Sequence, residues 1–247
     1  MQDKPVALVT GANKGIGLQI AKDLAAHGFT VLVGSRNVEH GETAAKSVGA
    51  DARALQLDVT NQASIAAAAE RIRNEFGRLD VLVNNAGISH AGKPGRSLEE
   101  NVKSGRLSVG DHVRAVFETN VFGVIAVTQA MLPLLREAPA ARIVNVSSSS
   151  GSLTMNSNPA NPHRAMFGTY SSSKTALNAI TLAFAIELES TTIKVNAACP
   201  GFTATDLNNF RGTRTVEQAA REPVRLALLD ANDPTGTFSN EDGPLPW

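Results

Sequence analysis

Short runs of apolar residues alternate along the chain with longer stretches of helical periodicity. The short runs are nearly continuous in apolar residues and end at Gly, Asn, Asp or Ser, which is typical of strands buried on both faces of a parallel sheet. They predict strands at Val6–Val9, Thr30–Gly34, Ala54–Leu57, Val81–Val83, Arg142–Val146 and Ile193–Ala197. The longer stretches predict helices at residues 15–27, 39–48, 61–76, 111–136 and 171–189. This alternation predicts an α/β fold with a doubly wound parallel sheet and helices on both faces.

Length and composition narrow the class of protein. The 247 residues, 43% of them apolar, suffice for one sizeable core, so we predict a single domain over residues 1–247. Lys plus Arg and Asp plus Glu both number 23, and this neutral balance makes nucleic acid or an anionic membrane surface a poor partner. The single cysteine, Cys199, excludes an internal disulfide. With a strand beginning near residue 6 and no long apolar run, we expect no signal peptide, no membrane helix and a cytoplasmic protein.

Two segments interrupt the alternation, residues 88–110 and 151–168. The first is polar and rich in glycine, and the second holds two prolines and three asparagines, a composition that favours irregular loops. Both follow predicted strands, and ligands of open α/β sheets bind beyond the carboxyl ends of the strands. We therefore expect both segments to border the ligand crevice and to select the substrate.

A glycine cluster lies between the first predicted strand and the first predicted helix. Gly11, Gly15 and Gly17 have the spacing G-x-x-x-G-x-G, which differs from the commoner G-x-G-x-x-G fingerprint. Glycines let the backbone turn sharply and approach a pyrophosphate, and a helix N-terminus supplies free N–H groups. Glycines also serve plain tight turns, but the position between strand and helix favours a nucleotide site.

The end of the second strand indicates which nucleotide is bound. NAD sites usually carry a carboxylate there for the ribose 2′-hydroxyl, whereas this chain has Ser35, Arg36 and Asn37, with no acid before Glu39. Arg36, with Lys14 nearby, suits a 2′-phosphate. The alternative is that both are ordinary solvated charges. The pattern favours NADP(H) over NAD(H).

Tyr170 and Lys174 are candidate catalytic residues. Their i, i+4 spacing places them on one face of a predicted helix. A phenol with a pKa of about 10 is a poor catalyst at neutral pH, and a neighbouring ammonium favours the phenolate. The serine run at residues 147–150 ends a strand and offers hydroxyls for a substrate oxygen. A Tyr–Lys pair alone is weak, but beside a dinucleotide turn and a serine-rich strand end it is far more specific.

Several motifs in this order resemble the short-chain dehydrogenase/reductase family over nearly the whole chain, and the carbonyl-reductase-like branch in particular. They are TGANKGIG (10–17), LDVT (57–60), NNAG (84–87), ETNVFG (118–123), VNVSSSSG (144–151), YSSSK (170–174), CPGFTATDL (199–207) and a TGTF strand (235–238). The resemblance implies a Rossmann fold and, in this branch, frequent use of NADPH.

The resemblance also implies roles for individual residues. Tyr170 would be the general acid, Ser148 would orient the substrate carbonyl, Lys174 would hold the nicotinamide ribose and lower the pKa of Tyr170, and Asn120 would position a relay water. The cofactor would contact the glycine turn, the end of the second strand, and three later loops. The expected cofactor residues are Gly11, Asn13, Lys14, Gly15, Ile16, Gly17, Ser35, Arg36, Asn37, Asp58, Val59, Asn85, Ala86, Gly87, Tyr170, Lys174, Pro200, Gly201, Phe202, Thr203 and Thr205.

The chain departs from the family pattern between Ser148 and Tyr170, which lie further apart than in much of the family. The extra residues fall in 151–168, which we expect to form a flap or wall at the substrate site; whether they keep the protein monomeric or leave a homo-oligomer is open. Cys199 fits a buried structural thiol better than a nucleophile, and His163 fits a solvated loop residue. No histidine spacing suggests a metal.

We therefore expect an NADP(H)-dependent oxidoreductase that interconverts a carbonyl, in a ketone or aldehyde, and an alcohol by hydride transfer. Two alternatives keep the fold: epimerase or dehydratase chemistry with a retained cofactor, and a non-catalytic NADP(H)-binding sensor. The sensor leaves Ser148, Tyr170 and Lys174 without a purpose. The substrate is a small molecule that the sequence does not identify.

Overall fold

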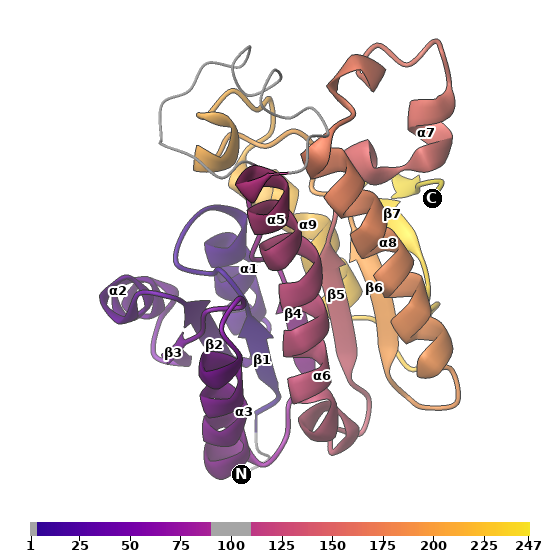
Figure 1. Ribbon diagram of the computed structural model, residues 1–247. Coiled ribbons are helices and arrows are strands. Elements are labelled where there is room, and N and C mark those ends of the chain that lie inside the picture. The colour runs from indigo at the N-terminus through magenta and orange to yellow at the C-terminus, as the bar shows by residue number, and fades with distance from the viewer. Residues whose placement is uncertain (1–3, 90–109) are drawn as a thin grey trace.

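The computed structural model describes residues 4–89 and 110–247, which form one sheet between two layers of helices (Figure 1). The strand order is β3-β2-β1-β4-β5-β6-β7-β8; neighbours from β3 to β7 pair in parallel, and β8 pairs antiparallel with β7. The strands are β1 Val6–Val9, β2 Thr30–Ser35, β3 Ala52–Gln56, β4 Val81–Asn84, β5 Arg142–Val146, β6 Lys194–Ala198, β7 Phe238–Asn240 and β8 Gly243–Pro244. The predicted doubly wound α/β fold is confirmed.

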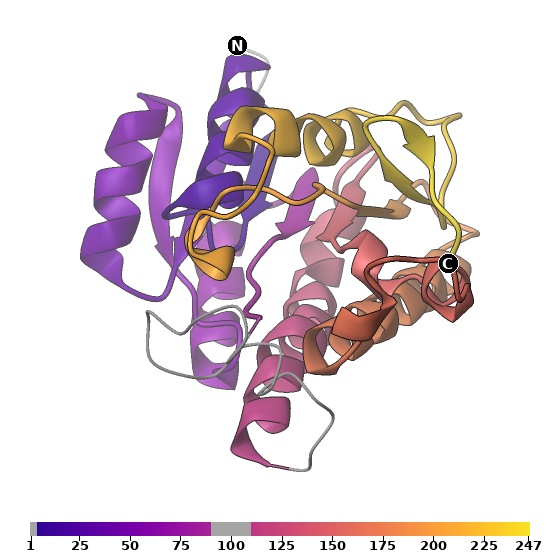
Figure 2. The ribbon, with the colours of Figure 1, turned by 90° about the horizontal axis from the view of Figure 1, so that it is seen from above.

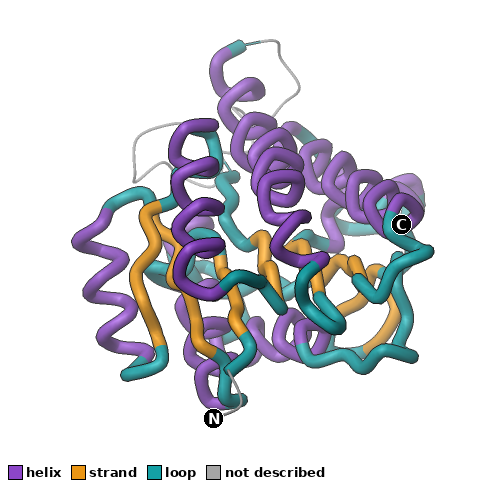
Figure 3. Tube along the Cα trace, turned by 90° about the horizontal axis from the view of Figure 1, so that it is seen from below, coloured by secondary structure: helices purple, strands orange, loops and turns teal. Residues whose placement is uncertain are grey.

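The helices cover both faces of the sheet, and Figure 3 shows the strands as a layer between them. One face carries α1 Gly15–Ala26, α2 Val38–Val48 and α9 Val216–Ala227. The opposite face carries α3 Gln62–Phe76, α6 Gly123–Arg136 and α8 Thr169–Glu187. Two shorter helices, α5 Asp111–Phe117 and α7 Leu153–Ser157, lie near the carboxyl ends of the strands, at the top of Figure 1. This edge is where the order of the strands reverses between β1 and β4, so the fold opens a crevice there.

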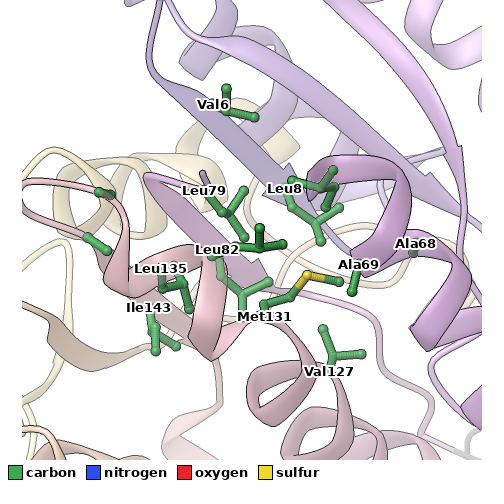
Figure 4. Packing of buried hydrophobic residues seen from close by; sticks show 14 of the residues in the cluster. Val6, Leu8, Ala68, Ala69, Leu79, Leu82, Val127, Met131, Leu135 and Ile143 are labelled. Atoms are coloured by element: carbon green, nitrogen blue, oxygen red, sulfur yellow. The ribbon is translucent and has the colours of Figure 1, made fainter. Parts of the chain in front are cut away.

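The core between the sheet and α6 explains the apolar character of that helix. Val127, Met131 and Leu135 of α6 lie in one buried cluster with Leu8 of β1 and Leu82 of β4 (Figure 4). Burying each such side chain contributes about 1.5–3 kcal/mol. The helical stretch His112–Arg136 is long and apolar enough to pass for a membrane span by composition alone. Its packing against β1, β4 and α3 identifies it instead as a core helix of this sheet.

The structure refines the predicted elements. The predicted strands are present with ends that differ by one or two residues, and the predicted helix over residues 111–136 is divided into α5, a π-helical turn at Glu118–Phe122, and α6. The predicted irregular segment 151–168 contains α7 and a 3₁₀ turn at Arg164–Met166. Residues 90–109 of the other predicted loop lie outside the described residues. Helix α9, which contains Pro223 in its interior, lies outside the predicted helices.

Candidate active site

The loops that follow β1, β4, β5 and β6 meet at the carboxyl edge of the sheet, which Figure 2 views from above. With the first turns of α8 they line a cleft of about 430 Å³, within the range of small-molecule and cofactor sites. The cleft brings together most of the predicted site residues. They are Gly11, Asn13, Lys14, Gly15, Ile16, Gly17, Arg36, Asp58, Val59, Asn85, Ala86, Gly87, Tyr170, Lys174, Pro200 and Thr205.

Some lining residues were not predicted, although most adjoin residues that were. They are Leu57, Thr60, Ile88, Ser89, Thr119, Val146, Ser147, Asp206 and Leu207. All but Ile88 and Ser89 stand within the recognised motifs, so the motifs themselves were the available signal. The sequence could not show that Asp206 and Leu207 reach the same cleft as the glycine turn.

The glycine turn after β1 leaves room for a ligand and little room for side chains. Gly11 and Gly15 have φ values of +63° and +58°, which favour glycine. A Cβ at Gly17 would stand 2.3 Å from the amide nitrogen of Asn85. Lys14 begins α1 as its N-cap in an extended conformation and makes no side-chain capping hydrogen bond, so the first N–H groups of the helix are left to a ligand. This cradle fits a pyrophosphate.

Hydrogen bonds tie the glycine turn to the loop after β4. The Asn85 side chain donates to the Thr10 carbonyl at 2.8 Å, and the Thr10 hydroxyl accepts from the backbone N–H groups of Asn85 and Ala86, both at 3.0 Å. The two loops are therefore held in a fixed relation across the switch point. The Asn85 side chain acts here as a structural brace of the cleft.

The end of β2 places only one of its three predicted residues on the cleft. Ser35 is buried and its hydroxyl donates to the Asn37 carbonyl, while the Asn37 side chain caps α2 by accepting from His40 N–H at 2.8 Å. Arg36 is exposed and lines the cleft. The side chains of Ser35 and Asn37 thus build the turn that presents the Arg36 guanidinium.

Lys14, the second predicted phosphate ligand, is held by a carboxylate from across the cleft. Its ammonium lies 2.9 Å from Asp206, and the two side chains are 63% and 56% exposed. An ion pair so exposed is worth at most about 1 kcal/mol. A phosphate group can therefore replace or share this contact at small cost.

The loop after β6 contributes Pro200, Thr205 and two residues that follow. Thr203 is buried and its hydroxyl donates within the loop to the carbonyls of Pro200 and Gly201. Phe202 is 54% exposed, and neither it nor Gly201 or Thr203 lines the cleft. The predicted contacts of Gly201, Phe202 and Thr203 with a cofactor therefore find no support in the lining of the cleft. Thr203 shapes the loop that carries Thr205.

Tyr170 and Lys174 lie together on α8, as their spacing predicts. The Lys174 ammonium is 5.7 Å from the centre of the Tyr170 ring and donates to the Val146 carbonyl at the end of β5, at 2.8 Å. The Ser148 hydroxyl lies beside the Tyr170 phenol and acts to lower its pKa, but it does not line the cleft. It also lies 2.9 Å from the Ser150 hydroxyl and accepts from Ser150 N–H. A hydroxyl, a phenol and an ammonium thus converge where α8 meets residues 147–151, which we call the serine turn.

Burial controls the protonation of this pair. Burial raises the pKa of Tyr170 well above its usual range; the nearby Cys199 raises it further, and the Ser148 hydroxyl opposes the shift. Burial also lowers the pKa of Lys174 to about 8. The expected lowering of the Tyr170 pKa by Lys174 is therefore wrong for this structure, because desolvation of the phenolate outweighs any attraction from the ammonium.

Asn120 lies in the π-helical turn between α5 and α6, and its side chain joins three elements. Its amide donates to the Ile88 carbonyl at 2.8 Å and to the Ser173 hydroxyl at 3.0 Å, and its oxygen accepts from Ile88 N–H at 2.8 Å. Asn120 is buried and does not line the cleft. A Cβ at Gly87 would lie 3.3 Å from its oxygen and 3.6 Å from the Lys174 ammonium, so both side chains lie beside Gly87. The predicted relay water remains a prediction.

The remaining candidates have structural surroundings. Cys199 is buried, and its sulfur accepts a hydrogen bond from Ser149 N–H at 3.1 Å. His163 is exposed in the loop after α7. Across residues 4–89 and 110–247, no three His, Cys, Asp or Glu side chains come together in a way that suits a metal ion.

Comparison with known proteins agrees with this geometry. The family model for short chain dehydrogenases matches residues 5–216. A short-chain dehydrogenase, anuI, from Penicillium roqueforti is 38% identical over 91% of this chain and 88% of its own length. Mouse carbonyl reductase [NADPH] 1 is 32% identical over 99% of both chains. The structure of salutaridine reductase from Papaver somniferum superposes with a TM-score of 0.79 at 30% identity, covering 95% of this chain and 99% of that one.

The matches span nearly the full length of the chain, and they include the strands, the glycine turn and the Tyr170–Lys174 pair. The relatives are reductases and dehydrogenases on the same fold. The chain is accordingly an oxidoreductase of the short-chain dehydrogenase/reductase family, similar to its carbonyl reductases.

Proposed function

We propose that the protein interconverts a carbonyl compound and an alcohol with NADP(H), using Tyr170 as the general acid and base. The observation that carries this proposal is that Tyr170 and Lys174 line the cleft that the glycine turn opens, with the Ser148 hydroxyl beside the Tyr170 phenol. Acid–base catalysis needs a proton donor within reach of the reacting oxygen, and a cofactor bound in the adjacent cleft would supply the hydride.

In carbonyl reduction, Tyr170 donates its phenolic proton to the substrate oxygen. Because burial raises its pKa, the neutral form that can donate is the one present at neutral pH. The Ser148 hydroxyl, beside Tyr170, would orient the same oxygen. Lys174 lines the cleft and would hold the ribose of a nicotinamide cofactor, and its hydrogen bond to the Val146 carbonyl fixes its position. Fixing these distances is the main contribution of the protein, and the bound nicotinamide provides the hydride.

The preference for NADP(H) rests on charge at the adenosine end of the cleft. Arg36 and Lys14 both line it, and the loop after β2 has no carboxylate before Glu39. A guanidinium and an ammonium attract a 2′-phosphate, whereas a ribose 2′-hydroxyl is usually bound by a carboxylate. The [NADPH] in the name of the mouse relative is consistent with this preference.

The test is to follow NADPH oxidation by the wild-type protein over a panel of ketones, aldehydes and quinones, with NADH in parallel. Tyr170→Phe is expected to lower kcat by at least two orders of magnitude while the dissociation constant for NADPH stays within about twofold, because the phenol supplies the proton and not the cofactor site. Ser172→Ala, two positions along α8, is the matched control and should keep full activity.

Four results would contradict the proposal. Normal turnover by Tyr170→Phe would remove Tyr170 from the mechanism. Faster turnover with NADH than with NADPH would refute the role of Arg36 and Lys14. Tight binding of NADPH with no turnover of any carbonyl compound would point to the non-catalytic sensor. Retained NADP(H) with epimerase or dehydratase activity would point to the other alternative.

A further inference from the structure

Trp247 lies beside the serine turn although it is far from it in sequence. Its indole ring stacks on Phe238 of β7, with ring centres 5.5 Å apart and planes inclined by 22°. Phe238 is buried in a small cluster with Ala197 and Cys199 at the end of β6, and Leu245 packs against the same cluster. The stacked ring therefore anchors residue 247 to the edge of the sheet nearest the catalytic loop. Figure 2 shows the C-terminal residue next to α7.

The main chain of Trp247 is bonded directly to the segment that continues the serine turn. Its backbone oxygen accepts from the Ser152 hydroxyl at 3.2 Å and from Thr154 N–H at 2.9 Å. The Ser152 side chain is buried and itself caps α7, accepting from Met155 N–H at 3.1 Å. Ser152 is thus fixed between Trp247 and the first turn of α7.

Two further contacts hold the rest of the turn. Cys199, from the cluster that Trp247 packs on, accepts from Ser149 N–H. On the other side Gly151 lies against α8: a Cβ there would be 2.7–2.9 Å from atoms of Lys174 and Thr175, and the Thr175 hydroxyl donates to the Gly151 carbonyl at 2.8 Å. The turn is therefore clamped between α8 and the C-terminal cluster.

We propose that Trp247 is a positioning residue that sets the Ser148 hydroxyl on Tyr170. Ser148 shares its oxygen with Ser150, whose hydroxyl and N–H both lie within hydrogen-bond distance. A small movement of the turn is enough to leave Ser148 bonded to Ser150 alone. Loss of the Trp247 anchor permits that movement, because residues 149 and 152 then lose support on the side away from α8. This inference rests on the proposed function, since it assigns Trp247 to the same catalytic hydroxyl.

The experiment compares Trp247→Ala, Trp247→Phe and Leu245→Ala. We expect Trp247→Ala to lower kcat about tenfold with the NADPH dissociation constant unchanged, because Trp247 does not line the cofactor cleft. Trp247→Phe keeps a ring to stack on Phe238 and should recover most of the activity. Leu245→Ala removes apolar contact from the same cluster without touching the hydrogen bonds of residue 247, and should keep kcat within about twofold.

The pH profile distinguishes positioning from loss of stability. The Ser148 hydroxyl acts to lower the pKa of Tyr170. Weakening this interaction should therefore move the rising limb of the pH–rate profile for alcohol oxidation to higher pH in Trp247→Ala, as in Ser148→Ala. In the Ser148→Ala background, Trp247→Ala should change neither the limb nor kcat further. The proposal is overturned if the limb stays in place, if the double variant loses a further tenfold, or if Leu245→Ala behaves like Trp247→Ala.

A readout independent of turnover keeps the two proposals separable. Amide hydrogen exchange at residues 149–154 should accelerate in Trp247→Ala relative to Leu245→Ala and Trp247→Phe. If the wild-type protein turns over no carbonyl compound but this exchange pattern is found, the proposed function fails while the clamp stands. Unchanged amide exchange at residues 149–154 in Trp247→Ala would refute the proposal that Trp247 holds this segment in place, whatever the activity.

Discussion

Burial shifts the pKa values of Tyr170 and Lys174 in opposite directions, and both shifts favour the neutral side chain. A phenolate and an ammonium each lose hydration when buried, so the pKa of the acid rises and that of the base falls, to about 8 for Lys174. The protein without cofactor therefore holds Tyr170 ready to donate a proton.

Titration of Tyr170 can be observed alone because it is the only tyrosine in the chain. The unfolded phenol ionises near pH ~10, whereas the folded one stays protonated, so the stabilisation it contributes is present below pH ~10 and is lost as the pH rises further. We expect no phenolate absorbance from the folded protein at pH ~10.5 and its appearance on unfolding in urea. Full ionisation in the folded protein near pH 10 would show that burial does not govern this residue. Tyr170→Phe provides the baseline.

Three residues predicted to bind the cofactor instead use their side chains to hold the turns in which they stand. Residue identity and position placed Ser35, Asn37 and Thr203 in the cofactor site, yet their side chains bond to the turns they stand in. Short polar side chains compete for nearby backbone groups, and a motif does not record which partner wins. Lys14, Arg36, Tyr170 and Lys174 were predictable because their long or ring-bearing side chains reach beyond their own turn.

At the scale of elements, the contact between the serine turn and α8 depends on Gly151. Gly151→Ala would place a Cβ 2.7–2.9 Å from backbone and Cβ atoms of α8, closer than real contacts allow, so the turn must move away. We expect a loss of about 1–3 kcal/mol in unfolding free energy and a fall in kcat larger than any change in NADPH binding. Chemical denaturation and steady-state kinetics measure the two effects. Gly110→Ala, where a Cβ meets open space, is the control, and equal behaviour of the two variants would contradict the argument.

The strands and helix α9 differ in how clearly the sequence indicates them. Strands β1, β2, β4 and β5 are nearly continuous apolar runs, and their buried positions follow from that pattern. Helix α9 has clear sequence signals, an amphipathic pattern and a capping box between Thr215 and Gln218, but Pro223 in its interior argues against a helix. It forms because Ala220, Val224 and Leu226 pack in one buried cluster with α1 and the sheet, and a single sequence does not report that packing.

For the whole molecule, cofactor binding should appear as stability. A ligand at 100 times its dissociation constant raises the unfolding free energy by about 2.7 kcal/mol. At equal concentrations we expect NADPH to raise the melting temperature more than NADH, and Lys14→Met to reduce that difference, because its ammonium lines the cleft and pairs only weakly with Asp206. Lys22→Met removes the same charge from an exposed position on α1 outside the cleft and should leave the difference intact. An equal shift with both cofactors in the wild-type protein would rule out discrimination by the 2′-phosphate.

The hydrogen bond between Ser152 and Trp247 joins positions 95 residues apart, and this has a consequence for the order in which the chain is made. Synthesis releases the glycine turn and the end of β2 long before β6 and residue 247, so a growing chain can build the phosphate cradle well before it can brace the serine turn. A ribosome-bound chain that still lacks its last strand is therefore expected to retain cofactor more readily than it turns over substrate. The same asymmetry recommends the end of the sheet where β1 begins, at the bottom of Figure 1 and opposite the cleft, for tethers and fusion partners.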